Sequence, residues 1–498
     1  MGFKLFSRTA LITLWTLLFF SISVRSEDDC PEFECPAKDG SFADPCTCRR
    51  FYQCVEFFPY KNFCPSNLYW DDIKKLCTFK NEAVCGPVTT TPAPSTTPPP
   101  DTANTCDISA CQLPYCFCSS DGTQIPGGLN KEDIPQMVML MLDGAVNTNN
   151  FDDYKKLFRE RTNPNGCKVK GTFFITHHYS KNSKVGGALR EVICIRARVH
   201  PNAHIEVLKN DGHEIAVSSI SDDSGLYLKN ASSWIDELVG MRTLLTQQVD
   251  LGVEDILGAR APGLKPGFND QYTAMIEYGF IWDSSVSALP LATPVWPYTL
   301  DYKIPHKCKA ESCPSRQFPG LWEIPLNSHH VEGFVAGHCP YLDQCVFTNM
   351  DSDDIFEWLK EDFLRHYTTN KAPYTLAMHT NWFTYKEQVT ALEKFMNYTN
   401  TLDDVYYVTA TQALLWMTDP VGLDELILVD SWSCDPEEEK VDPPCVSPNQ
   451  CALSHTENDI SVIKYMTTCK TCPAVYPWLG NVYGKETEEK DVYPKFED

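Results

Sequence analysis

Residues 136–147 read QMVMLMLDGAVN, an apolar run that ends in a single carboxylate. Residues 138–142 are apolar without interruption, which is typical of a strand buried on both faces of a parallel sheet. The strand delivers one carboxylate, Asp143, and the next position holds Gly144 where a second acidic residue could have stood. Because functional residues of parallel α/β domains gather at the carboxyl ends of the strands, we predict that Asp143 lies in a functional site.

Further apolar runs and amphipathic stretches continue this pattern along the chain. We predict strands at residues 171–175, 214–217, 256–259, 280–282, 322–325, 374–378 and 405–408, and helices at residues 151–161, 233–249, 352–367 and 387–398. Strands that alternate with helices indicate an α/β domain with a parallel sheet, open or closed into a barrel. Arg260, Asp283 and His379 each follow a predicted strand directly, so we expect them to share one cleft with Asp143.

Composition and the N-terminus indicate an exported protein. Lys4 and Arg8 precede a short apolar run at residues 10–20, as in a signal peptide, which we place at residues 1–26. The 23 cysteines indicate a disulfide framework, and Asn230 and Asn397 begin glycosylation sequons. The formal net charge of −24 disfavours nucleic acid and anionic membranes as partners. We therefore expect a secreted, extracellular protein that binds a neutral or weakly cationic polymer.

Changes in composition divide the chain into five parts. After the signal peptide, residues 27–86 are rich in cysteine, and residues 87–104 form a Thr/Pro-rich linker. Residues 105–434 form the α/β domain, and residues 435–498 form an acidic extension that contains cysteines.

The small cysteine-rich domain contains more aromatic residues than its size suggests it can bury. These are Tyr52, Phe57, Tyr60, Tyr69 and Trp70, which either stack on sugar rings or fill a thin core between disulfides. The spacing of six cysteines, with GSFADP before them and LYWD between them, resembles the peritrophin-type chitin-binding module. The resemblance implies the pairs Cys35–Cys54, Cys48–Cys85 and Cys64–Cys77, and leaves Cys30 and Cys46 as additions to the pattern.

The motifs of the large domain carry a second resemblance. They are CDISACQLPYCFCSSDGTQIPG, PQMVMLMLDGAVN, TFFITHHYS, GHEIAVSSI, RAPGLKPG, WDSS, LWEIP, LAMHTNWF and TCKTCPAVYPWLGN, in that order. Together they resemble the arthropod chitin deacetylases of the polysaccharide deacetylase family. The resemblance implies a distorted barrel of β/α units that hydrolyses the N-acetyl groups of N-acetylglucosamine polymers with a divalent metal, usually zinc.

The same resemblance implies a role for each residue at the strand ends. Asp143 matches the catalytic base, His379 the catalytic acid, Arg260 the residue that orients the base, and Asp283 the acid that supports the histidine. Trp382 matches an aromatic residue that stacks on the substrate sugar, although a tryptophan at a strand end can equally belong to the core. Gly263 stands where the family usually has an aromatic residue.

All three positions that hold the metal in the family are changed. Gly144 replaces an Asp, and Ser218 and Asp222 replace two His. Catalytic zinc generally needs about three protein ligands, so we expect no bound metal. His213 precedes a predicted strand, and we interpret it as structural.

Three functions remain open from the sequence. The first is a catalytically impaired homologue that binds chitin in cuticle or peritrophic matrix, and the second is an active, zinc-dependent deacetylase. The third is a lectin-like or signalling protein for another N-acetylated glycan. Residues 185–203 have no family counterpart and contain Cys194, which we predict to be the odd cysteine. They are either a surface loop or an error in the gene model, and the sequence does not predict an oligomeric state.

Overall fold

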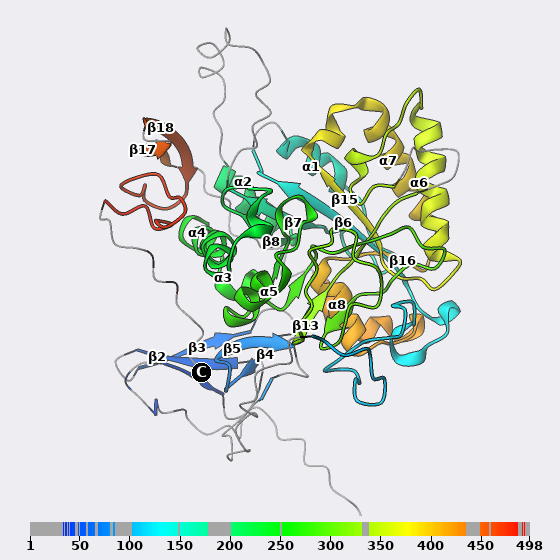
Figure 1. Cartoon of the computed structure of the whole chain (residues 1–498), viewed down its shortest axis with the longest axis horizontal. Helices are drawn as coiled ribbons and strands as arrows, with labels where there is room; N and C mark the ends of the chain where they lie inside the picture. Colours follow the sequence, from blue (N-terminus) through cyan, green and yellow to red (C-terminus); the bar gives the residue numbers. More distant parts are fainter. Residues whose placement is uncertain are drawn as a thin grey trace, which may run out of the picture.

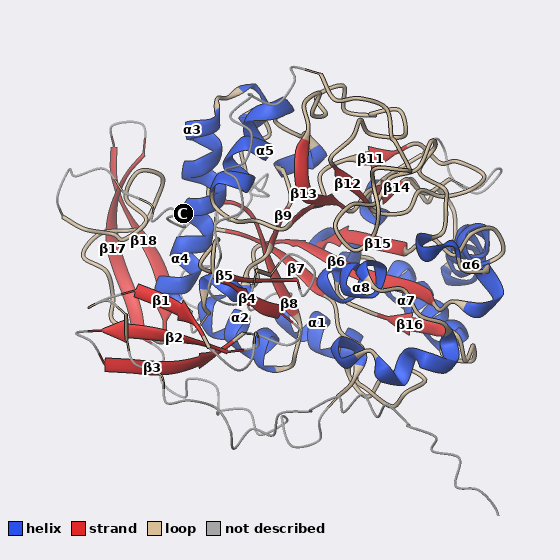
Figure 2. Ribbon diagram, turned by 90° about the horizontal axis from the view of Figure 1, so that it is seen from below, coloured by secondary structure: helices blue, strands red, loops and turns tan. Residues whose placement is uncertain are grey.

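The computed structural model describes most of residues 33–84 and the larger part of the remaining chain (Figures 1 and 2). The described ranges after the small domain are residues 102–147, 150–177, 201–249, 251–330, 338–434, 449–457 and 460–486, with Asp491 and Tyr493. The sequence predictions outside these residues concern the signal peptide, most of the linker, the acidic segment 435–448, Cys30, Cys46, Phe57, Cys85 and Cys194. No helix in the described part is long and apolar enough to cross a membrane.

The large domain is built on one curled, nine-stranded sheet (Figure 2). In spatial order its strands are β12, β13, β10, β9, β8, β7, β6 and β15, and β16 pairs with the first residues of β6. Every pairing is parallel except that of β12 with β13. The bounds are β6 Gln136–Gly144, β7 Thr172–Thr176, β8 Glu214–Ser219, β9 Gly258–Ala259, β10 Trp282–Asp283, β12 Tyr298–Leu300, β13 Phe318–Glu323, β15 Tyr374–His379 and β16 Val405–Tyr407.

Alternate residues of β6 belong to two different cores. Val138, Leu140 and Leu142 belong to one cluster, whereas Met137, Met139 and Met141 belong to the other. The first cluster packs the outer face of the sheet against helices, and the second fills the inner, concave face. The prediction that β6 is buried on both faces is therefore confirmed.

The outer face is covered by helices that pack along the sheet (Figure 1). They are α1 Phe151–Phe158, α2 Pro201–Asn210, α3 Ala231–Trp234, α4 Gly240–Gln248, α5 Phe268–Glu277, α6 Ser352–Tyr367 and α7 Lys386–Thr399. A π-helical turn, Ile235–Val239, joins α3 to α4. Helix α8, Ala410–Thr418, instead contributes its apolar residues to the inner core.

The predicted fold class is confirmed, with small shifts in element ends. All eight predicted strands and all four predicted helices are present, and α6 has the predicted bounds. A short parallel pair, β11 Ser287–Ala288 with β14 Leu326–Asn327, lies outside the main sheet. The sequence did not predict α5, α8 or the antiparallel strand β12.

The small N-terminal domain is a disulfide-linked β structure. Strands β1 Gly40–Ala43, β2 Arg50–Val55 and β3 Phe58–Phe63 form an antiparallel sheet, and β4 Leu68–Asp71 pairs with β5 Leu76–Phe79. The predicted pairs Cys35–Cys54 and Cys64–Cys77 are confirmed. Cys48 is also in a disulfide, but its predicted partner lies outside the described residues.

Six further disulfides join described cysteines of the large domain and its extension. They are Cys106–Cys118, Cys111–Cys116, Cys167–Cys434, Cys308–Cys313, Cys339–Cys345 and Cys451–Cys472. Cys167–Cys434 connects residues 267 positions apart and so restricts nearly the whole domain in its unfolded state. The extension adds an antiparallel hairpin, β17 Asn449–Glu457 with β18 Ile460–Thr468.

Packing at the sheet centre gives a test of the inner core. Gly258 of β9 lies beside Trp282 of β10, and a Cβ at residue 258 would overlap the indole ring. We expect Gly258→Ala to lower the free energy of unfolding by about 1–3 kcal/mol through overpacking, as measured by denaturant unfolding. Gly225→Ala is the matched control, because its Cβ would meet only the flexible Asp223 side chain. Equal stability of the two variants would contradict this packing.

Candidate active site

The strand register gathers polar side chains at the carboxyl end of the inner face. Asp143 follows Met141 by two residues and so points to the same inner face. His379 lies directly opposite Asp143 in the parallel pairing of β15 with β6. Ser218 follows Ala216 of the inner core by two residues on β8, and Arg260 follows Ala259 of the outer core by one.

Asp143 and Arg260 form a buried ion pair. Arg260 Nη1 donates to Asp143 Oδ2 at 2.6 Å, and the Arg260 side chain is fully buried. Tyr341, which the sequence reasoning missed, donates its hydroxyl to Asp143 Oδ1 at 3.1 Å. Both carboxylate oxygens of Asp143 therefore accept a hydrogen bond from a fixed donor.

The guanidinium of Arg260 is held on every side. Its Nε donates to the Ser284 carbonyl at 2.8 Å, and its Nη2 donates to Ser284 Oγ at 2.8 Å. The ring of Phe174 lies 3.7 Å from the guanidinium carbon. The geometry brings Arg260 to Asp143 as the family resemblance implied, and it leaves Arg260 no freedom to move.

His379 is supported by an acid that the sequence reasoning missed. The Nδ1 atom of His379 lies 3.2 Å from both Asp343 oxygens, and the His379 backbone N–H donates to Asp343 Oδ1 at 2.9 Å. Burial lowers the pKa of His379, but the hydrogen bond to Asp343 and the negative charges of Asp143, Asp343 and Asp222 outweigh it, so the pKa is raised. Burial raises the pKa of Asp343, but its bonds to His379 outweigh this, and the pKa falls below its usual value.

Asp343 lies in a loop that a disulfide closes. It belongs to the 3-10 turn Leu342–Gln344, between Cys339 and Cys345, which are bonded to each other. The ring of Tyr341 packs 4.2 Å from that of His379, so the same loop contacts both halves of the site. The sequence signal that could have identified Asp343 was an acidic residue between two closely spaced cysteines, but no predicted strand directly precedes it.

The assignment of Asp283 as the support of His379 is wrong. Trp282 belongs to the inner core, so the next residue of β10 points to the outer face, away from His379. Asp283 accepts hydrogen bonds there from Gln271 Nε2 at 2.9 Å and from the Tyr272 hydroxyl at 3.1 Å.

A second buried acid accompanies Asp283 on the outer face. Glu323 lies opposite Asp283 in the pairing of β13 with β10. Burial, and then the negative charge of Asp283, raise the pKa of Glu323 well above its usual value. This pair is a structural element of the sheet rather than part of the cleft.

The residues at the positions that the resemblance assigns to the metal do not fit a zinc ion. Gly144 offers no side chain and has φ +115°, and Ser218 offers only a hydroxyl. Asp222 is the one carboxylate of the three, and desolvation together with the negative charges of Asp143 and Asp223 raises its pKa, against the attraction of His379. Within the described residues, no group of three or more His, Cys, Asp or Glu is arranged to hold a metal ion.

Two predicted sugar-stacking residues belong to the core instead. Trp382 is fully buried and meets the edge of Phe347. Trp70 is also buried, stacks on Phe51 at 4.1 Å and donates its Nε1–H to Asp72. Neither indole can offer a face to a polymer in this structure, because protein atoms cover both.

The remaining predicted binding residues are placed as follows. Tyr52 and Tyr69 are half-buried, with Tyr52 stacked on Phe33, and Tyr60 lies in β3. Asn230 and Asn397 are exposed, so both sequons are accessible on the surface. His213 is buried and its Nδ1 accepts from the Gly171 backbone N–H at 3.1 Å, which confirms its structural role.

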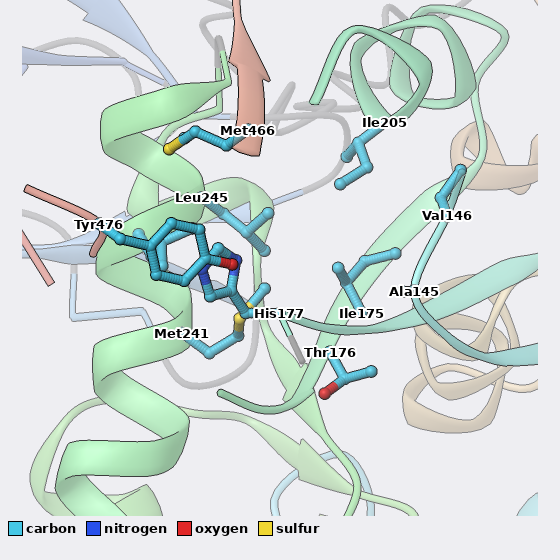
Figure 3. A pocket seen from close by; sticks show the side chains of 11 residues that line it. Ala145, Val146, Ile175, Thr176, His177, Ile205, Met241, Leu245, Met466 and Tyr476 are labelled. Carbon is cyan, nitrogen blue, oxygen red and sulfur yellow. The ribbon is translucent and has the colours of Figure 1, made fainter. Parts of the chain in front are cut away.

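An apolar pocket lies beside the site, on the outer side of the strand ends (Figure 3). It has about 430 Å³ of empty space, part of which is open solvent. Ala145 and Val146 line it directly after β6, and Tyr476 of the extension covers it and stacks on His177. None of the polar side chains around Asp143 lines this pocket.

Comparison with known proteins identifies the family. Residues 35–85 match the model described as "Chitin binding Peritrophin-A domain". The chain is 35% identical over 408 residues to chitin deacetylase 1 of Bombyx mori, and the aligned region covers 77% of this chain and 69% of that protein. It is 30% identical over 394 residues to chitin deacetylase 8 of Bombyx mori, and the aligned region covers 77% of this chain and 94% of that protein.

This chain belongs to the chitin deacetylase family and carries an N-terminal peritrophin-A chitin-binding domain. Among solved structures, a probable polysaccharide deacetylase from Pseudomonas aeruginosa PAO1 aligns with 57% of this chain and 92% of its own, at 15% identity and a TM-score of 0.37. The family assignment depends on the two relatives and not on this structural likeness.

The contact between His379 and Asp343 can be tested by titration. We expect Asp343→Asn to lower the pKa of His379, because it removes the hydrogen-bonding carboxylate, as measured by NMR of the imidazole. The native pKa of His379 is raised, so the pair stabilises the fold below the unfolded pKa of about 6.5, and this stability is lost as pH rises through the native pKa. The variant should therefore be destabilised more at pH 6 than at pH 9. In the matched variant Asp283→Asn, the pKa of His379 should not change; a fall there would restore the original assignment.

Proposed function

We propose that this protein is a secreted, chitin-binding member of the chitin deacetylase family that does not hydrolyse N-acetyl groups. The observation that carries the proposal is the set of side chains at the metal positions, Gly144, Ser218 and Asp222, which supplies a single carboxylate. Zinc in catalytic sites is generally held by about three protein ligands, and this set falls short of that number.

The loss of a metal cannot be offset by the groups that remain. A bound metal lowers the pKa of water from about 15.7 to about 7, which corresponds to roughly 12 kcal/mol of help in forming hydroxide. A general base such as Asp143 typically contributes about 10²–10⁴-fold, or roughly 3–5 kcal/mol. Both oxygens of Asp143 accept a hydrogen bond, one from Arg260 and one from Tyr341, and these bonds fix the orientation of the carboxylate.

The site nevertheless keeps groups that can bind an N-acetylated sugar. The raised pKa of His379 favours its protonated form, which donates hydrogen bonds to carbonyl and hydroxyl oxygens. The side chain of His379 is 39% exposed, so it is accessible to solvent. The cleft can therefore position a sugar without activating water.

Several features support an extracellular, chitin-rich setting. The peritrophin-A domain gives the chain a module for the polymer. The disulfides of both domains are typical of an oxidising compartment, and the predicted signal peptide agrees with export. The negative charge favours chitin that is partly deacetylated, and hence weakly cationic, over acidic polymers. Cuticle or peritrophic matrix would supply such a polymer.

One observation supports the alternative of an active, metal-dependent deacetylase. The charges of Asp222, Asp143 and His379 affect one another, so the three lie near each other at the cleft. In this alternative, zinc is held by Asp143, Asp222 and a borrowed histidine. The third function, recognition of another N-acetylated glycan, would appear on a glycan array as preference for ligands other than chitin oligomers.

Metal content and acetate release distinguish the proposal from its alternative. We expect the purified, unchelated protein to contain no stoichiometric zinc and to release no acetate from chitin oligomers. The triple variant Gly144→Asp, Ser218→His and Asp222→His should bind zinc, because it rebuilds an Asp and two His at the family positions. A Cβ at residue 144 meets no atom within 4 Å, but φ +115° strains any residue other than glycine there, at about 1–3 kcal/mol.

The two-histidine variant, Ser218→His with Asp222→His, is the matched control and should bind zinc more weakly than the triple variant. Zinc-dependent acetate release by the unmodified protein would defeat the proposal. A folded triple variant that does not bind zinc would show that the site differs from a zinc site at positions other than the three ligands.

Chitin binding by the small domain gives a separate test. We expect Tyr69→Ala to weaken binding of the full chain to insoluble chitin by roughly 1–3 kcal/mol, taking the scale of aromatic stacking on nucleic-acid bases. Tyr69 is half-buried, whereas Trp70→Ala would disrupt the core of the domain. Tyr115→Ala, which removes an exposed aromatic ring outside that domain, is the control. Unchanged retention of Tyr69→Ala would remove this residue from the binding surface.

A further inference from the structure

The outward face of the C-terminal hairpin carries no charged side chain. Burial alternates along both strands, which separates an inner face from an outer one. The exposed residues of the outer face are Gln450, Ala452, Ser454 and Thr456 of β17, with Ser461, Ile463 and Tyr465 of β18. In a chain with a formal net charge of −24, this is a neutral surface of apolar groups, hydroxyls and one amide.

Two of these side chains are large, apolar and well exposed. Tyr465 is 71% exposed and Ile463 is 55% exposed. Ile463 lies opposite Ser454 and Tyr465 lies opposite Ala452, so small residues flank the large ones and leave them accessible. An exposed aromatic ring beside apolar side chains and hydroxyls is the composition of a binding surface rather than of a solvating one.

The hairpin is fixed from its other face. Cys451, Leu453 and Met466 are buried against Tyr476, and Cys451 is bonded to Cys472. The Thr468 hydroxyl donates to the Gln248 carbonyl at the end of α4. The outer face is therefore held on a rigid support, so its side chains are ordered before a ligand arrives.

The same extension reaches the end of the sheet that contains Asp143. Tyr476 donates its backbone N–H to the Ser454 carbonyl and stacks on His177, which directly follows β7. A ring nitrogen of His177 lies 3.2 Å from the Pro477 carbonyl. The extension thus contacts the residue that follows β7, and Figure 3 shows Tyr476 beside His177.

We propose that the outer face of the β17–β18 hairpin is a second contact surface for chitin, separate from the peritrophin-A domain and from the cleft. The inference rests on the proposed function, since it takes chitin as the polymer. The ring of Tyr465 stacks on a pyranose face, and Ile463 extends the apolar contact along the strand. Ser454, Thr456 and Ser461 offer hydroxyls to the sugar hydroxyl and acetamido groups.

The absence of charge favours this ligand over others. A neutral polymer carries no charge that could offset the cost of desolvating a carboxylate or an ammonium group, so a charged face would bind it less well. Nine successive residue pairs join the two strands without a bulge, which makes the face a continuous ribbon. An extended chain of linked sugars can lie along such a ribbon and contact several side chains at once.

The experiment compares variants of the full chain on insoluble chitin. We expect Tyr465→Ala and, independently, Ser454→Glu to weaken binding by roughly tenfold, the scale of one lost aromatic stacking contact. Tyr115→Ala is the matched control, because Tyr115 is 62% exposed and lies far from the hairpin in sequence. It should bind as the unmodified protein does. All variants must keep the unmodified thermal unfolding midpoint, which is expected because each side chain faces solvent.

Each outcome decides between clear alternatives. If Tyr69→Ala loses binding while both hairpin variants retain it, the second surface is overturned and the proposed function stands. If the unmodified protein does not bind chitin, both proposals fail. If Tyr465→Ala instead changes the mass measured by analytical ultracentrifugation, the face joins two copies of this chain, and the chitin assignment is overturned.

Discussion

The buried ion pair of Arg260 with Asp143 is the constraint on which the rest of the site depends. A guanidinium with no solvent exposure must have a carboxylate beside it, and removal of one partner of such a pair costs about 3–5 kcal/mol. The pair connects β6 to the segment after β9, and Ser284 and Phe174 hold the guanidinium from the other sides. Asp143 is therefore required by the fold whether or not it takes part in chemistry.

The same requirement does not extend to every residue near Asp143. Gly144 has no side chain and Ser218 is uncharged, so neither balances a buried charge. His379 lies between these cases, because its side chain is partly exposed and is also paired with the largely buried Asp343.

The positions of the strands were predictable because apolar runs and helical periodicity depend only on residues that are close together in the sequence. β6 and β15 were predicted to within two residues, and the carboxyl ends of these strands correctly located Asp143 and His379. The face to which the last side chain of each strand points was harder to predict from the sequence, because a two-residue strand such as β10 shows no alternation of apolar and polar residues. Asp283 was placed in the cleft for that reason, whereas the packing of Trp282 turns it outward.

Residues that act from loops or from the core were the hardest to predict. Asp343 and Tyr341 belong to a loop whose position depends on a disulfide. Neither residue lies in a periodic apolar pattern, so the sequence gives no signal for its position. Trp70 and Trp382 have the composition of sugar platforms, but their burial depends on neighbours that are distant in sequence or lie in another strand. Burial of a single aromatic residue is a property of the whole fold.

The backbone at residue 144 limits which side chains this position can carry. Its φ of +115° is one that aspartate rarely adopts, so an acidic side chain here would strain the backbone by about 1–3 kcal/mol. A Cβ at this position would nevertheless meet no atom within 4 Å. Room for a side chain is therefore different from tolerance of one, because the dihedral angles of a strand end can exclude a residue that its surroundings would accept.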